Sequence, residues 1–120
     1  VTLATPGGDR QVQWLAQALQ RFRLGRPVAE IAAAPRWFVC PEGDRFGVPG
    51  GIAETWYAFA EPGIEWVDQD RCAGYEVRPV PSVGGGLQVI VREGGTWQAA
   101  SDPRTAGRAM AVEEARCTSG

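Results

Sequence analysis

The 120-residue sequence contains no histidine and no lysine, and it has only three cysteines. Without histidine, the chain cannot by itself form a Ser-His-Asp triad, a Cys-His dyad or most zinc sites. The cysteines are Cys40, Cys72 and Cys117, and neither their odd number nor their spacing fits a metal site. We therefore expect thiols without a catalytic role, no metal and no cofactor, while a Cys40–Cys72 disulfide stays open.

Long hydrophobic runs are also missing. Even the longest apolar runs, such as Ile31 to Ala34, are far shorter than the roughly 20 apolar residues that a transmembrane helix needs. No charged segment followed by an apolar one opens the chain, so no signal peptide is visible. That absence says little if the chain is the downstream piece of a longer precursor. The location stays open between periplasmic or extracellular and cytoplasmic.

A strong charge of either sign is absent as well. The formal net charge is −2 and the isoelectric point is about 5.1, which argues against binding to nucleic acid or to an anionic membrane. The length and a hydrophobic content of 44% predict one globular domain.

What the sequence does contain begins with two helical segments. Five apolar residues recur at helical spacing: Val12, Leu15, Ala16, Leu19 and Phe22. They predict an amphipathic helix over residues 10–24, with polar residues, Gln17 among them, on the opposite face. We expect the side chain of Asp9 to cap its start and Gly25 its end. A second helix is expected over 28–34, where a following proline ends it.

Runs of β-branched and aromatic residues predict strands in the rest of the chain. The expected strands are residues 1–4, 36–40, 75–80, 87–92, 96–100 and 108–112. Residues 52–60 fit a strand or a helix, and residues 64–73 predict a short helix closed by Gly74. Turn-forming residues predict loops over 41–51 and 81–86. The glycines of the second loop indicate a hairpin connection rather than a phosphate cradle, because no lysine follows them.

The order of these elements predicts an α+β fold. We expect the two helices to pack on one face of an antiparallel sheet built mainly from residues 75–80, 87–92 and 96–100. Pro79 places the first of these strands at an edge of the sheet. Gly94-Gly95 supplies the hairpin turn between the other two.

A Pro-Gly-Gly turn joins the first strand to the first helix, within the run from Thr5 to Gln11 (Thr-Pro-Gly-Gly-Asp-Arg-Gln). Consecutive glycines can take positive φ and let a ligand approach the backbone closely. The amides of such a turn, next to a helix N-terminus, carry partial positive charge and suit an anion or an oxyanion. Because such a motif is more often plain turn chemistry, both interpretations stay open at this point.

Four short motifs follow one another along the chain. They are the run Thr5–Gln11 followed by Trp14 and Leu15, the run Pro27–Arg36 ending in Ala-Pro-Arg, the run Gly74–Val77, and the run Ala100–Arg104 followed by Gly107. In this order they resemble the γ-glutamyltranspeptidase family over roughly residues 1–112, with Tyr75 where that family commonly has histidine. Its members are N-terminal-nucleophile hydrolases that cut themselves into a large and a small subunit. The new N-terminal threonine of the small subunit then attacks γ-glutamyl or related amide bonds.

The resemblance implies that the chain forms part of a four-layer αββα sandwich. It also implies that the backbone amides of Gly7 and Gly8 form the oxyanion hole of the intact enzyme. Asp102 and Arg104 are expected to pair locally and fix the last turn, a structural role that polar turn residues usually have.

The nucleophile segment of the family, a Thr-x-His sequence, is not in this chain. The neighbours of Thr2 and Thr5 do not match it, so neither threonine is expected to be the nucleophile. Residues 1–112 therefore resemble the C-terminal portion of a small subunit, and residues 113–120 look like a polar tail.

Two functions from different classes follow. In the first, the chain is a segment of a threonine-nucleophile γ-glutamyltransferase or amidohydrolase that is inactive alone. It would act on γ-glutamyl-type amides when assembled with the upstream part of the small subunit and with the large subunit. In the second, it is a catalytically silent scaffold or subunit-interface domain. An upstream Thr-x-His-x-x-Val sequence would favour the first.

Overall fold

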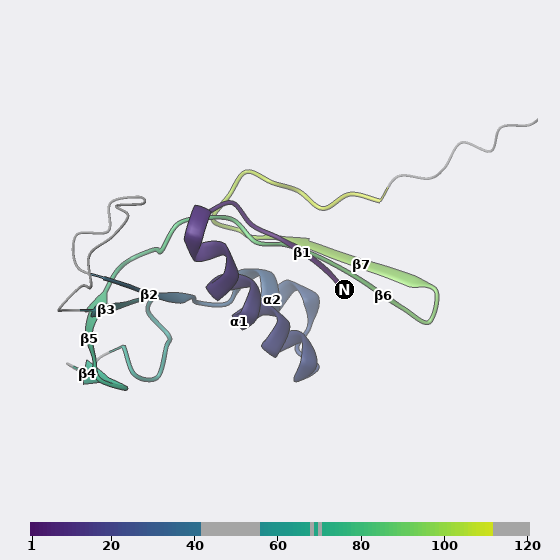
Figure 1. The fold of residues 1–120 in the computed structure, drawn as a ribbon. Coiled ribbons are helices and arrows are strands. Elements are labelled where there is room, and N and C mark those ends of the chain that lie inside the picture. Colours follow the sequence, from purple (N-terminus) through teal and green to yellow (C-terminus); the bar gives the residue numbers. More distant parts are fainter. Residues whose placement is uncertain (42–55, 68, 70, 112–120) are drawn as a thin grey trace, which may run out of the picture.

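Two β-sheets and a pair of α-helices make up the part of the chain that the structure describes (Figure 1). The computed structural model describes residues 1–41, 56–67, 69 and 71–111. The first sheet has the order β1 (Thr2–Ala4), β6 (Gln88–Glu93), β7 (Thr96–Ser101) and is antiparallel throughout. The second has the order β2 (Trp37–Pro41), β3 (Trp56–Ala60), β5 (Tyr75–Pro79), β4 (Arg71–Cys72). The α+β class predicted from the sequence is confirmed.

The helices are α1 (Gln11–Arg23), which follows one turn of 3₁₀ helix, η1 (Gly8–Arg10), and α2 (Val28–Ala33). Both α-helices lie where the sequence analysis predicts them, α1 from its periodicity and α2 from the proline that follows it. Asp9 lies inside η1 rather than before a helix, and no side-chain capping bond forms at either start among the described residues. The expected cap by Asp9 is therefore not seen.

Gly25 ends α1 as predicted. Its φ of +71° is a left-handed conformation that glycine adopts without a steric penalty. The N–H of Gly25 donates to the carbonyl of Phe22 at 2.9 Å, and the N–H of Arg26 donates to that of Arg21 at 3.1 Å. This pair of bonds is the Schellman arrangement, which satisfies carbonyls at the end of the helix and lets α2 begin at once.

The first sheet packs its inner face against the helices. Side chains alternate along β6, so that Val89 and Val91 are buried while Ile90 is exposed. The buried members of this core are Ala18, Val28, Ile31, Ala32, Leu87, Val89 and Val91. The hairpin between β6 and β7 turns at Gly94 and Gly95, with φ values of +53° and +84°. This half of the predicted sheet is confirmed.

The buried face of α1 differs from the apolar face that periodicity predicts. Val12 and Leu19 are exposed, whereas Trp14, Gln17 and Ala18 are buried. The reason is that α1 contacts the first sheet on one side and strand β2 on the other. The second contact draws polar side chains inward.

Gln13 and Gln17 complete the free edge of β2. The Gln17 side chain donates to the carbonyl of Trp37 at 2.8 Å and accepts from its N–H at 3.2 Å. Gln13 does the same for Val39, at 2.9 and 2.8 Å. One turn apart on the helix, the two amides substitute for a neighbouring strand and pair backbone groups that an edge strand would leave open.

Strand β5 lies in the second sheet, so its predicted place beside the β6–β7 hairpin is wrong. It runs parallel to β3, from the pair Tyr57↔Glu76 to the pair Ala60↔Pro79. Parallel strands need a crossover, and residues 61–74 supply one. The residues after β5 then carry the chain to the first sheet instead of forming a hairpin. β4 pairs with the first half of β5. Only the second half of β5, which contains Pro79, therefore lies at an edge of the sheet.

Three further predictions meet different outcomes. Residues 64–67, 69 and 71–73 form turns and the short strand β4 rather than a helix, because Arg71 and Cys72 pair with β5, and the Trp66 ring packs against that of Trp37 at 5.8 Å between centroids. Residues 108–111 form no strand. The ambiguous stretch 52–60 is a strand over 56–60.

Several expectations fall outside the described residues. They concern residues 42–55, residue 112 and the tail over 113–120. Cys40 is buried in β2, and its pairing with Cys72 stays untested. Within the described ranges, no helix is long and apolar enough to cross a membrane.

Candidate functional site

The Gly7–Gly8 turn lies between β1 and α1, where the sequence analysis places it. Gly7 has φ +152° and Gly8 has φ +56°, both in the range that disfavours side chains. The carbonyl of Gly7 accepts the N–H of Arg10 at 3.2 Å, which starts η1. No bond from the amide N–H of either glycine occurs to the residues that the structure describes. These donors lie at the positive end of η1 and α1 and are available to an anion.

The indole of Trp14 packs against this turn. Trp14 is 2% exposed and projects from the first turn of α1. A Cβ built on Gly7 would overlap Cζ3 of that indole. Gly7 is therefore required for close packing as well as for its φ. Gly8 differs, because nothing lies within 4 Å of a Cβ built there.

A buried charge cluster is formed by Arg36, Glu61, Asp102 and Arg104, and it links the residues just before β2 and just after β3 to those just after β7. Arg36 Nη2 lies 2.9 Å from Asp102 Oδ2, and the two side chains are 1% and 0% exposed. Burial lowers the pKa of Arg36, and the charge of Arg104 lowers it further, while Asp102 and Glu61 oppose the change. The ion pair keeps the buried guanidinium compensated.

Asp102 and Arg104, the residues paired in the sequence analysis, lie 3.1 Å apart between Arg104 Nη1 and Asp102 Oδ2. Asp102 also accepts the N–H of Arg104 at 2.9 Å and that of Leu87 at 3.3 Å. Arg104 reaches further, since its Nη2 donates to the carbonyls of Ala33 and Ala34 at 2.8 and 2.7 Å. The pair thus joins the end of β7 to the start of β6 and to the C-terminus of α2.

Arg36 and Glu61 complete the cluster and were missed as site residues in the sequence analysis. Glu61 accepts the N–H groups of Arg36 and Val83, each at 2.9 Å. Its carboxylate lies 3.4 Å from Arg104. Arg36 was visible only as the last residue of an Ala-Pro-Arg motif, and no spacing in the sequence connects it with a glutamate 25 positions later.

Trp14 lies between the glycine turn and the charge cluster. The guanidinium carbon of Arg36 is 5.3 Å from the centre of the Trp14 ring, a cation–π distance. The indole also packs edge-to-face against Phe38 at 6.4 Å. The structure therefore brings Gly7, Trp14 and Arg36 into one stack, although Asp102 and Arg104 do not touch the glycines themselves.

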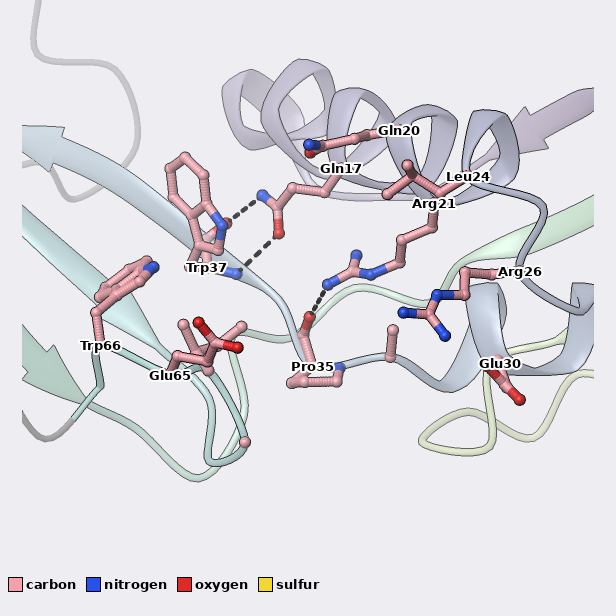
Figure 2. A pocket seen from close by; sticks show the side chains of 13 residues that line it. Gln17, Gln20, Arg21, Leu24, Arg26, Glu30, Pro35, Trp37, Glu65 and Trp66 are labelled. Atoms are coloured by element: carbon pink, nitrogen blue, oxygen red, sulfur yellow. Dashed lines mark hydrogen bonds between the residues drawn. The ribbon is translucent and has the colours of Figure 1, made fainter.

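A cavity of about 590 Å³ opens at the other end of α1 (Figure 2). Charged side chains of both signs face it, among them Arg21, Arg26 and Glu65. Arg21 Nη2 donates to the carbonyl of Pro35 at 2.6 Å. Burial lowers the pKa of Arg21, and Arg36 and Arg104 lower it further. Neither glycine of the turn lines this cavity, so it is separate from the candidate site.

Thr2 and Thr5, the two threonines considered as nucleophiles, have contacts that belong to the fold. Thr2 lies in β1 opposite Ile90, and the hydroxyl of Thr5 donates to the carbonyl of Pro6 at 3.0 Å. In the described ranges, no group of histidine, cysteine and carboxylate side chains could hold a metal ion.

Comparison with solved structures shows the same fold in two bacterial enzymes. The γ-glutamyltranspeptidase of Pseudomonas nitroreducens, solved in complex with L-DON, matches with a TM-score of 0.65 and 24% identity over 92% of this chain. A mutant of the Helicobacter pylori γ-glutamyltranspeptidase matches with a TM-score of 0.54 and 16% identity over 86% of it. The chain spans only about half of these structures, 54% and 53% respectively.

Comparison by sequence gives two results. A search of curated proteins finds no match. The family model described as gamma-glutamyltranspeptidase matches residues 1–112, nearly the whole chain. The chain belongs to the γ-glutamyltranspeptidase family.

Proposed function

We propose that this chain is the part of a threonine-nucleophile γ-glutamyltransferase or amidohydrolase that carries the oxyanion hole. It is the C-terminal portion of the small subunit. It acts with the upstream part of that subunit and with the large subunit, and it is inactive alone. The substrate is a small molecule with a γ-glutamyl-type amide bond.

The observation that carries the proposal is the pair of unengaged amides at Gly7 and Gly8. When a threonine attacks an amide carbonyl, negative charge develops on the carbonyl oxygen. Two N–H donors fixed beside that oxygen stabilise the transition state more than the ground state. The packing of Trp14 under Gly7 supports a turn that is held in place before the reaction begins.

The expected inactivity of the isolated chain follows from its content. It has no Thr-x-His segment, and no base contacts the hydroxyl of Thr2 or Thr5 among the residues that the structure describes. N-terminal-nucleophile chemistry uses the α-amino group of the nucleophile itself as the base, so the lack of histidine is compatible with the assembled enzyme.

A second candidate, a silent scaffold or subunit-interface domain, is favoured by the outer face of the β6–β7 hairpin. Ile90 is 42% exposed, Trp97 66% and Met110 78%. Together with Ala109 they line a shallow hollow of about 540 Å³. Such apolar surface is typical of a contact face, and it is also what one half of an αββα sandwich would present to the other half.

A chromogenic γ-glutamyl anilide separates the two functions. The purified chain and the full-length protein that contains it are incubated with the anilide, and heat-treated samples serve as controls. We expect release from the full-length protein after self-cleavage and none from the isolated chain. A self-cleaved, folded full-length protein without turnover on any γ-glutamyl amide would favour the scaffold.

A further inference from the structure

The loop between β5 and β6 touches the glycine turn through Gly85. A Cβ built on Gly85 would lie 2.7 Å from Cζ3 of Trp14 and 2.9 Å from the carbonyl oxygen of Pro6. It would also lie 3.2 Å from Oγ1 of Thr5. Gly7 lies against the same Cζ3 atom of Trp14. Gly85 and the turn therefore press on the same indole, and Gly85 in addition touches the backbone that leads into the turn.

The buried charge cluster holds this loop in place. Arg36 Nη2 donates to the carbonyl of Gly84 at 2.9 Å, while Asp102 compensates the charge of Arg36. Glu61 accepts the N–H of Val83 at 2.9 Å. The two residues before Gly85 are thus fixed by buried, charged partners, and such bonds are stronger than neutral ones.

We propose that Gly85 is a positioning residue, held by Arg36 through Gly84, which sets the direction of the Gly7 and Gly8 amides. The path runs from Arg36 to the loop, from the loop to Trp14 and Pro6, and from there to the turn. This inference rests on the proposed function of the turn. It assigns a catalytic consequence to a loop that supplies no group to the substrate.

The physical reason is the small tolerance of an oxyanion hole. A displacement of about 1 Å in a reacting geometry can lower the rate by about 100-fold. Any side chain at Gly85 must displace both the indole of Trp14 and the carbonyl of Pro6, because both would lie within 3.0 Å of its Cβ. Tight packing passes such shifts on to neighbouring atoms.

The test compares Gly85→Ala with Gly95→Ala in the full-length protein. Both glycines have positive φ, +70° and +84°, so both variants carry similar backbone strain. Nothing lies within 4 Å of a Cβ at Gly95, in the exposed hairpin. We expect Gly85→Ala to lower kcat by at least about tenfold with KM within about threefold, as for a loss of transition-state stabilisation alone. Gly95→Ala should leave both unchanged.

A second variant, Trp14→Phe, covers the case in which Gly85→Ala does not fold. It removes ring atoms from beneath the turn without adding bulk, and it should also lower kcat more than it raises KM. Where both variants fold, Gly85→Ala added to Trp14→Phe should lower kcat less than it does alone, because the contact with Cζ3 of Trp14 is gone and only that with the carbonyl of Pro6 remains.

The outcomes separate this inference from the function on which it rests. Equal kcat for Gly85→Ala, Gly95→Ala and the parent would overturn the inference, as would a loss confined to KM or losses that simply add with Trp14→Phe. If Gly8→Val loses kcat while Gly85→Ala does not, the oxyanion role stands and only the positioning role falls. If Gly8→Val also keeps its kcat, the proposed function of the turn fails first.

Discussion

The guanidinium of Arg36 and the carboxylate of Asp102 lie 2.9 Å apart, and neither side chain is more than 1% exposed. The two residues are 66 positions apart in the sequence, just before β2 and just after β7. Their contact joins the start of β2 in the second sheet to the end of β7 in the first, and it places one carboxylate within reach of two arginines. Removing Asp102 therefore leaves the buried guanidinium of Arg36 without its ion-pair partner, whereas Asp102 keeps Arg104 when Arg36 is removed.

Asp102→Ala should lower the free energy of unfolding by about 3–5 kcal/mol, because it strands Arg36 in the interior. Glu76→Ala is the matched control. It breaks an ion pair of the same 2.9 Å length to Arg78, but those side chains are 43% and 49% exposed. An exposed pair contributes about 0–1 kcal/mol. Urea denaturation measures both variants, and similar losses would contradict the assignment of Asp102 to a buried cluster.

Gln17→Ala should lower the free energy of unfolding by about 1–3 kcal/mol, since it leaves the N–H and carbonyl of Trp37 without their partner at the edge of β2. Gln20→Ala is the control: it lies on the exposed side of the same helix, changes helix propensity by the same amount and removes no such bond. Its effect should stay within about 0.5 kcal/mol. If the two variants denature at the same urea concentration, the pairing of Gln17 with the edge of β2 does not stabilise the fold.

The isolated chain should self-associate through the outer face of the β6–β7 hairpin. Ile90→Lys should reduce association seen by light scattering, because it places a charge in the apolar hollow beside Trp97. Val12→Lys is the control, since Val12 is 74% exposed on α1, away from this face. A parent chain that stays monomeric at high concentration, or equal effects of the two variants, would count against this face.

Local signals in the sequence predict the helices and one hairpin correctly. The 3.6-residue period places α1, Gly25 ends it, and Gly94-Gly95 turns β6 into β7. Each of these depends on residues a few positions apart. They are fixed by backbone geometry, which a short stretch of sequence carries in full.

Contacts between distant residues were not visible in the sequence. Nothing in Tyr75–Pro79 shows that its partner is β3 and not β6, because a strand pattern predicts a strand without naming its neighbour. The Gln17 side chain is buried because it pairs with the edge of β2, which has no neighbouring strand there among the described residues. Glu61 joins the charge cluster only because the antiparallel pairing of β2 and β3 places the end of β3 beside Arg36. The glycine turn was found by its motif, but its support by Trp14 required the structure.

The most direct measurement is the steady-state kinetics of Gly8→Val in the full-length enzyme, with Gly94→Val as control. The two glycines have nearly the same φ, +56° and +53°, and both have open space at Cβ. Gly8→Val should lower kcat by about 100- to 1000-fold while KM changes little, because the lost donor acts on the transition-state oxyanion. Gly94→Val should keep the kcat of the parent. A Gly8→Val enzyme that folds, cleaves itself and keeps kcat within about threefold of the parent would contradict the account.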